Sequence, residues 1–199
     1  MGLVTLVIGL FLFIGAHVSV TLRPRRAAIV KAVGLVPYKI LMSVVSLAGL
    51  YLVFRGFGMY RDSGLVPLWS PPVFMRHVTE ALMLPACILL AAAFLPGHIK
   101  AAVKHPLLVA VKTWAFAHLL TNGDVGGIIL FGSLLAWAVY DRITLKHRSD
   151  PVAPLIAPGG YGNDIAAVIV GIILFLALGM VFHPLVVGVI VFGTPAFGT

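Results

Sequence analysis

The sequence predicts an all-α membrane protein, a polytopic helical bundle of about six transmembrane helices with its N-terminus outside. Three observations lead to this fold. Hydrophobic residues make up 61% of the 199 residues and charged residues only 10%, whereas soluble domains carry about 25% charged residues. Six apolar stretches recur along the chain. Their lengths are close to the roughly 20 helical residues that are needed to cross a hydrocarbon core about 30 Å thick. The basic residues between these stretches lie mainly on alternate connections.

Residues 1–199 are expected to form a single integral-membrane domain, because a soluble fold of this size could not bury so much apolar surface. The predicted spans, in chain order, are Leu3–Val20, Lys39–Gly58, His77–Leu95, Leu107–Leu120, Val125–Tyr140 and Ile165–Phe182.

The first three spans have ordinary boundaries. Leu3–Val20 is expected to be a retained span and not a cleaved signal peptide, because its arginine cluster follows the apolar run. Its small residues Gly2, Gly9 and Ala16 recur every seven positions and predict a face for close helix packing. Pro37 precedes the second span, and Pro71-Pro72 precedes the third.

The fourth and fifth spans are short. Fourteen residues in Leu107–Leu120 give a helix of only about 21 Å. Either this span starts earlier, or the turn Thr121–Asp124 lies below the membrane surface. Polar groups of a recessed turn must be satisfied within the protein, so the turn would belong either to a site or to a structural hydrogen-bond network. Asp124 is also placed to cap the fifth span.

The distribution of basic residues predicts the orientation. Eleven of the fourteen Lys and Arg lie on the odd-numbered connections or just inside the span that follows, which marks these connections as cytoplasmic and places both termini outside. The net charge of +8 is therefore attributed to anchoring at anionic lipid headgroups, and nucleic acid is not expected as a partner. The eleven are Arg23, Arg25, Arg26, Lys31, Lys39, Lys100, Lys104, Lys112, Arg142, Lys146 and Arg148.

Seven histidines are the residues most able to support chemistry in so apolar a chain. An intramembrane histidine is costly unless it faces the interior and finds a partner. His17 lies near the end of the first span, and His118 lies in the fourth, with Trp114 and Asn122 on the same helical face. Two such imidazoles could bind a haem iron between helices. The alternative is that each interior histidine hydrogen-bonds a neighbour, and the spacing alone favours that alternative.

Other reactive groups support fewer functions. Cys87 is the only cysteine, which excludes a disulfide, a thiolate metal site or covalent haem attachment within one chain. Glu80 is expected to be protonated or to pair with Arg76 or His77. Lys112 can extend to the nearest interface. No nucleophile motif or proton-relay path is evident.

The chain resembles the NnrU family over essentially its whole length. The most specific stretch runs through Lys104–Leu108, Val111–Ala115 and Ala117–Asp124. Further matching residues are Tyr38-Lys39, Ser46–Leu50, Pro67–Trp69, Pro71-Pro72, Leu82–Ala86, Leu95–Ile99, Gly132-Ser133, Ala136-Trp137 and Asp141-Arg142.

This resemblance implies a multi-pass protein of the bacterial inner (cytoplasmic) membrane. It also implies an accessory role in denitrification, supporting the expression or maturation of nitrite and nitric oxide reductases. Plant zeta-carotene isomerase is related to the family and resembles a haem b enzyme. The resemblance therefore implies haem b as a cofactor, with His17 and His118 as axial ligands, Trp114 and Asn122 beside them, and His105 and His183 as reserves.

Two functions are accordingly expected as alternatives. The first is an accessory factor for nitrogen-oxide respiration that binds haem b through interior histidines. The second is a haem b-dependent cis-trans isomerase of a polyene such as 15-cis-zeta-carotene. Whether the chain is an enzyme stays open at this point. The expected partners are the lipid bilayer, haem and, for the isomerase, a hydrophobic polyene, while the sequence identifies no protein partner. A small-solute carrier is disfavoured because no span carries a polar stripe.

Overall fold

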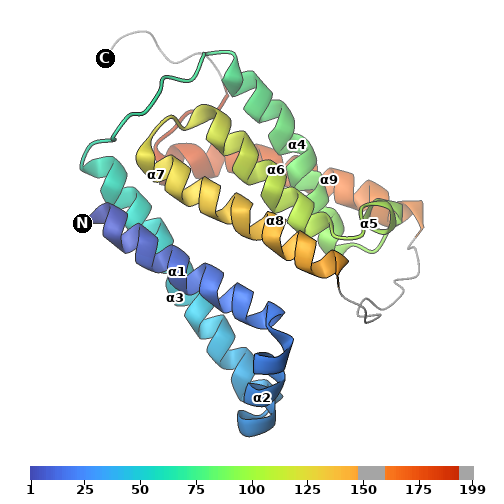
Figure 1. Cartoon of the computed structure of the whole chain (residues 1–199). Helices are drawn as coiled ribbons and strands as arrows, with labels where there is room; N and C mark the ends of the chain where they lie inside the picture. The colour runs from blue at the N-terminus through green and yellow to red at the C-terminus, as the bar shows by residue number, and fades with distance from the viewer. Residues whose placement is uncertain (148–159, 193–199) are drawn as a thin grey trace. The chain divides into compact units, whose positions relative to one another are not determined.

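The computed structural model describes residues 1–147 and 160–192. All secondary-structure elements in this part of the chain are helices, and it contains no β-strand (Figure 1). The predicted all-α fold is thereby confirmed. The elements are α1 (Gly2–Thr21), α2 (Arg23–Val33), α3 (Leu35–Asp62), α4 (Met75–Phe94), α5 (His98–Val103), α6 (Pro106–Thr121), α7 (Val125–Gly127), η1 (Ile128–Gly132), α8 (Ser133–Lys146), α9 (Tyr161–Ala177) and η2 (Leu178–Val187), where η denotes π-type winding.

Among the described residues, five helices are long and apolar enough to cross a membrane, as expected of a multi-pass membrane protein. These are Gly2–Thr21, Leu35–Asp62, Met75–Phe94, Val125–Lys146 and Tyr161–Val187. They correspond to five of the six predicted spans.

The fourth and fifth spans, both predicted to be short, differ in length in the structure. The fifth predicted span is longer than expected, because α7, η1 and α8 run on as one rod of 22 residues, Val125–Lys146. The fourth remains short, since α6 has 16 residues and measures about 24 Å. It begins at Pro106, whose missing N–H suits a first helical position, so an earlier start is not the explanation for its length. The outside location of the N-terminus stays a prediction, and Arg148 of the fifth connection lies outside the described residues.

The helices form two compact units. Unit 1 consists of Met1–Pro71 and residues 122–147, and unit 2 consists of Pro72–Thr121 and residues 160–192. Each unit is described by itself below.

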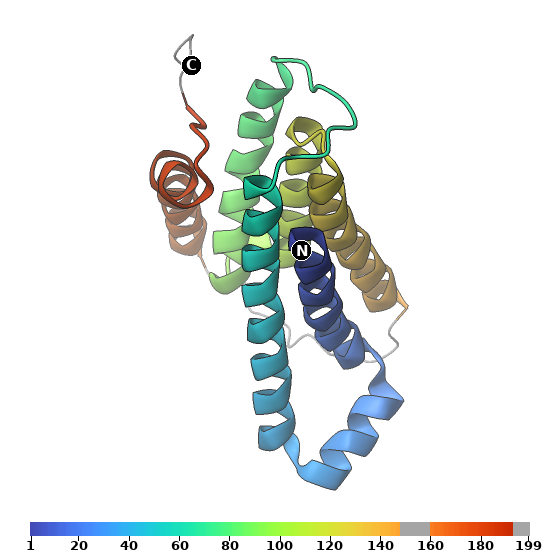
Figure 2. The ribbon, with the colours of Figure 1, turned by 90° about the vertical axis from the view of Figure 1, so that its left-hand side faces the viewer.

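Unit 1 is built on close contact between α1 and α3, which lie side by side with α2 joining them at one end (Figure 2). A Cβ on Gly9 would lie 2.5 Å from the Val53 backbone nitrogen, and one on Gly49 would lie 2.6 Å from the Phe13 nitrogen. The helices can approach this closely only because these positions lack side chains. The predicted contact face of Gly2, Gly9 and Ala16 is confirmed, since all three are buried.

Unit 2 packs α4 against both α6 and α9. Small residues again allow the approach: Ala91, Ala92 and Ala167 form a buried cluster, and a Cβ on Gly171 would lie 2.5 Å from the Ile88 Cα. In a lipid solvent such contacts stabilise helix association through van der Waals packing, because burial from lipid adds no hydrophobic driving force.

The start of α5 is tied to α9 by one carboxylate. Asp164 accepts hydrogen bonds from the backbone N–H groups of His98, at 3.1 Å, and Ile99, at 3.0 Å, and its Oδ2 lies 2.8 Å from the His98 Nδ1. Asn163 beside it donates to the Pro96 carbonyl at 2.7 Å. The otherwise unsatisfied donors at the beginning of a helix are here satisfied by a side chain from another helix.

We predict that Gly9→Leu destabilises unit 1, because the new side chain would collide with the backbone of α3. Overpacking of this kind lowers the free energy of unfolding by about 1–3 kcal/mol. The matched control is Gly15→Leu on the same helix, where a Cβ meets nothing within 4 Å. Thermal unfolding of the purified protein in detergent, followed by circular dichroism, measures the difference. Equal melting temperatures for the two variants would contradict the role assigned to Gly9.

Candidate functional site

Two histidines of unit 2 lie close together, although 65 positions separate them in the sequence. The imidazole of His118 on α6 and that of His183 in η2 have ring centroids 6.2 Å apart, and their planes differ by 24°. Aromatic side chains flank the pair: the Trp114 ring lies 5.2 Å from His118, and the Phe182 ring lies 5.8 Å from His183. This cluster is called the His118–His183 pair below.

Both imidazoles are held in one tautomer by their own helices. The Nδ1 of His118 lies 2.9 Å from the Trp114 carbonyl, and the Nδ1 of His183 lies 2.7 Å from the Leu178 carbonyl. A carbonyl oxygen can only accept, so each Nδ1 must carry the proton, and the neutral ring then carries its lone pair on Nε2. A histidine that donates its other ring N–H to a carbonyl is the arrangement found for most metal-ligating histidines.

The position of His183 depends on local π-type winding. Pro184 has no N–H and so removes one helical hydrogen bond next to the histidine. The His183 side chain bonds to a carbonyl five residues earlier, whereas His118 bonds to one four residues earlier. Wider turns of this kind occur often at functional sites. Beyond η2 the chain folds back, since a Cβ on Gly179 would collide with the ring of Phe192.

Polar side chains at the start of α4 link this helix to other segments of unit 2. The Arg76 guanidinium pairs with Glu80 at 3.2 Å and donates to the Val191 carbonyl at 2.9 Å. The other Glu80 oxygen lies 3.4 Å from the His77 Nδ1. The predicted pairing of Glu80 with Arg76 or His77 is therefore confirmed for both partners. One turn away, the Thr79 hydroxyl donates to the Ala117 carbonyl at 2.9 Å and links α4 to α6 beside His118.

His17 lies in unit 1 and has a similar local arrangement. Its Nδ1 lies 2.7 Å from the Phe13 carbonyl. The Phe13 ring lies 4.4 Å away, and the Trp137 ring on α8 meets it edge-on at 5.1 Å. Because His17 and His118 belong to different units, their joint ligation of one iron stays a prediction. The reserve His105 lies between α5 and α6 and is not part of the His118–His183 pair.

Asn122 is the first residue of the second segment of unit 1, and it opens a turn that is held by residues 66–69. The Gly123 carbonyl accepts hydrogen bonds from the N–H groups of Leu68, at 2.7 Å, and Trp69, at 3.1 Å, and the Val125 N–H donates to the Val66 carbonyl at 3.0 Å. A side chain on Gly123 would collide with the Trp69 carbonyl. These contacts favour the structural hydrogen-bond network over a site for this turn.

Asp124 completes the network. It is only 7% exposed, and its Oδ1 accepts the Gly127 N–H at 2.8 Å, so it caps the following helix as predicted.

The side chains of unit 2 limit which kind of metal centre it could hold. The described residues contain no group of three or more His, Cys, Asp or Glu that could hold a metal ion by themselves. A haem iron needs only axial ligands from the protein, since the porphyrin supplies the rest. In the His118–His183 pair the ring centroids are 6.2 Å apart and the ring planes are 24° from parallel, so two imidazole donors from different helices lie close together in this unit.

Sequence reasoning named both members of this pair without joining them. His183 was expected only as a reserve ligand, and it directly follows the last predicted span, which ends at Phe182. The helix continues through Pro184 to Val187 in the wider winding. The role of Asp164 was not foreseen at all, since its partners on α5 lie 65 and 66 residues away.

Comparison with known proteins identifies a family. The sequence matches the family described as NnrU protein over residues 5–191, which include both units. No curated protein and no solved structure matches the chain.

We predict that Asp124→Ala lowers the free energy of unfolding by about 1 kcal/mol, because the Gly127 N–H loses its capping partner. Asp124→Asn is the matched control, since its amide oxygen can still accept that hydrogen bond. Thermal unfolding in detergent compares the two. If both variants melt together with the unmodified protein, the capping role of Asp124 is wrong.

Proposed function

The chain belongs to the NnrU protein family, and from that premise we propose that it is a haem b-binding accessory factor of the bacterial inner membrane. Its role would be to support the expression or maturation of nitrite and nitric oxide reductases. The observation that carries the haem part is the His118–His183 pair, with its 6.2 Å ring separation and two Nδ1 groups bonded to backbone carbonyls.

Within this proposal, His118 and His183 are the residues that would hold the haem iron. Trp114 and Phe182 lie beside the imidazoles and supply apolar ring surface for a porphyrin. When bound, haem supplies one-electron redox chemistry or an iron that can bind a small diatomic ligand. The residues of the chain orient the two imidazoles, exclude water and keep Nδ1 protonated.

The surroundings favour a tightly positioned site. Thr79 fixes the backbone of α6 one residue before His118. Arg76 holds the Val191 carbonyl and so fastens the segment that follows η2. These two contacts hold the backbone near the two histidines and do not touch the imidazoles themselves.

A second candidate shares the cofactor. The aromatic rings beside the pair also offer a surface for a polyene, which favours the alternative of a haem b-dependent cis-trans isomerase acting on a substrate such as 15-cis-zeta-carotene. Incubation of the haem-loaded protein with that substrate, followed by chromatography of the isomers, separates this candidate from the accessory factor.

We predict a Soret band in the full chain purified in detergent from haem-replete bacteria. His118→Ala and His183→Ala should each lose most of this absorbance, because either change removes one axial nitrogen. The control is His147→Ala, whose Nδ1 also lies near a carbonyl of its own helix, Ile143, at 2.8 Å. That control should keep the full spectrum.

Each outcome decides a separate part of the proposal. A colourless protein from haem-replete cells rejects haem binding. A Soret band that survives His183→Ala but not His17→Ala moves the second ligand to His17, as the sequence alone predicted. The accessory role is tested in a denitrifying host that lacks this gene, by measuring nitrite and nitric oxide reductase activity. Activities equal to those of the parent strain reject it.

A further inference from the structure

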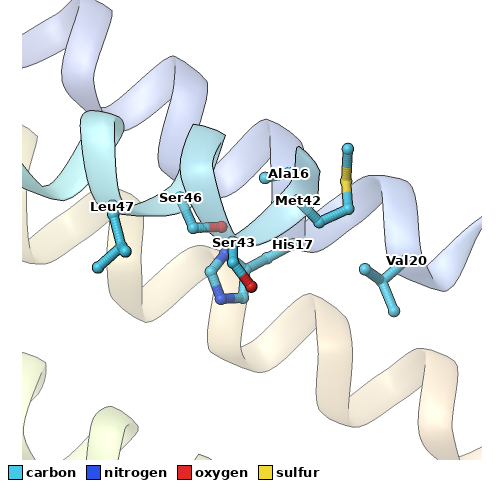
Figure 3. Close-up of a pocket in the computed structure, with 7 residues that line it drawn as sticks. All are labelled: Ala16, His17, Val20, Met42, Ser43, Ser46 and Leu47. Atoms are coloured by element: carbon cyan, nitrogen blue, oxygen red, sulfur yellow. The ribbon is translucent and has the colours of Figure 1, made fainter. Parts of the chain in front are cut away.

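A pocket in unit 1 has no role in the function proposed above. It has a volume of about 410 Å³ and opens between α1 and α3 (Figure 3). Its lining residues are Ala16, His17 and Val20 from α1, and Met42, Ser43, Ser46 and Leu47 from α3.

The small residues of the two helices explain where the pocket lies. Gly9 on α1 and Gly49 on α3 bring the backbones into contact. Ala16 lies seven residues after Gly9 on α1, Met42 lies seven residues before Gly49 on α3, and both line the pocket. The Met42 sulfur lies 3.3 Å from the Ser19 hydroxyl. The glycine contact therefore ends at this level, and the space beside it is the pocket.

Three polar side chains lie together in this otherwise apolar space. Figure 3 shows the hydroxyl groups of Ser43 and Ser46 next to the His17 ring. The Nδ1 of His17 is bonded to the Phe13 carbonyl, so its other polar atom is Nε2, which carries a lone pair.

The two serine hydroxyls have no hydrogen-bond partner within the part of the chain that the structure describes. Ser19 and Thr21 on α1, by contrast, donate to carbonyls of their own helix at 2.6 and 2.7 Å. A hydroxyl left unsatisfied in an apolar solvent costs free energy that a polar ligand can recover.

A buried donor also lies close to His17, although its residue does not line the pocket. The indole Nε1–H of Trp137 is buried and has no hydrogen-bond partner among the described residues. Its ring meets the His17 imidazole at 5.1 Å. Buried polar groups in proteins nearly always have a partner, so an acceptor is expected near this indole.

The chemistry of these groups selects one class of ligand. The lone pair of His17 needs an O–H donor, the serines can donate to an oxygen, and the walls are apolar with the aromatic Phe13 and Trp137 close by. A phosphate or carboxylate headgroup is disfavoured because no lysine or arginine lines the pocket. A plain acyl chain would leave the three polar groups unsatisfied.

We propose that this pocket binds the head group of a membrane-soluble quinol. One hydroxyl of the quinol donates to the His17 Nε2, and its other oxygen accepts from Ser43 or Ser46. The ring lies against the apolar walls, and the tail extends into lipid. The volume of about 410 Å³ falls within the usual range of roughly 300–1,000 Å³ for small-molecule sites. This site is independent of the His118–His183 pair and does not rest on haem binding.

The test is equilibrium binding of tritiated decylubiquinol to the full chain in nanodiscs, with empty nanodiscs measuring simple partition into lipid. Saturable binding of one molecule per chain is expected. His17→Leu should weaken it about tenfold, and the double change Ser43→Ala with Ser46→Ala should do so too, because each removes a hydrogen bond to the ligand. His147→Leu, in the same unit and outside the pocket, should leave the affinity unchanged.

Several results would overturn the proposal. Uptake that never saturates, or equals that of empty nanodiscs, means that no such site exists. Unchanged affinity in both pocket variants places the quinol elsewhere. The Soret band of the same samples serves as a second readout: it should survive His17→Leu, and its loss would make His17 a haem ligand instead. Circular dichroism melting shows whether each variant is folded, and His17→Gln repeats the test if His17→Leu is not.

Discussion

The constraint on which this structure depends is that lipid offers no hydrogen-bond partner, so polar side chains must be satisfied by the protein. His17, His118 and His183 each bond to a carbonyl of their own helix through Nδ1. Asp124 and Asp164 accept from N–H groups at the beginnings of helices. In satisfying the solvent constraint, the helices also orient the three imidazole rings, because each Nδ1 is bonded to a carbonyl of its own helix.

Small residues provide the second organising feature. In unit 1 the contact of Gly9 with α3 brings two backbones together, and in unit 2 Gly171 does the same between α9 and α4. Such contacts place whole helices, and with them the side chains further along. The pocket beside His17 begins where glycine gives way to Met42, so the same packing that stabilises the helix pair also locates a cavity.

The sequence predicts helices better than it predicts which helices meet. Apolar length is a local property, and it located the spans, although the second, fifth and sixth helices are longer than predicted and the fourth stays short. His118 could be singled out because an interior histidine is costly in lipid. His183 was named only as a reserve, and its closeness to His118 could not be predicted, because contacts between helices are not encoded locally. The network around Gly123 depends on Val66 to Trp69, a segment with no predicted element of its own.

The π-type winding of η2 has a consequence for how the His118–His183 pair could change. An α-helix advances its side chains by about 100° per residue. If Leu178–Val187 rewound to ordinary α-helical phase, the azimuth of His183 would turn away from α6, and the bond from its Nδ1 to Leu178 would no longer match the repeat. Removing one residue from this segment would have the same effect. The helical phase of a single turn thus sets whether the His183 ring lies beside the His118 ring.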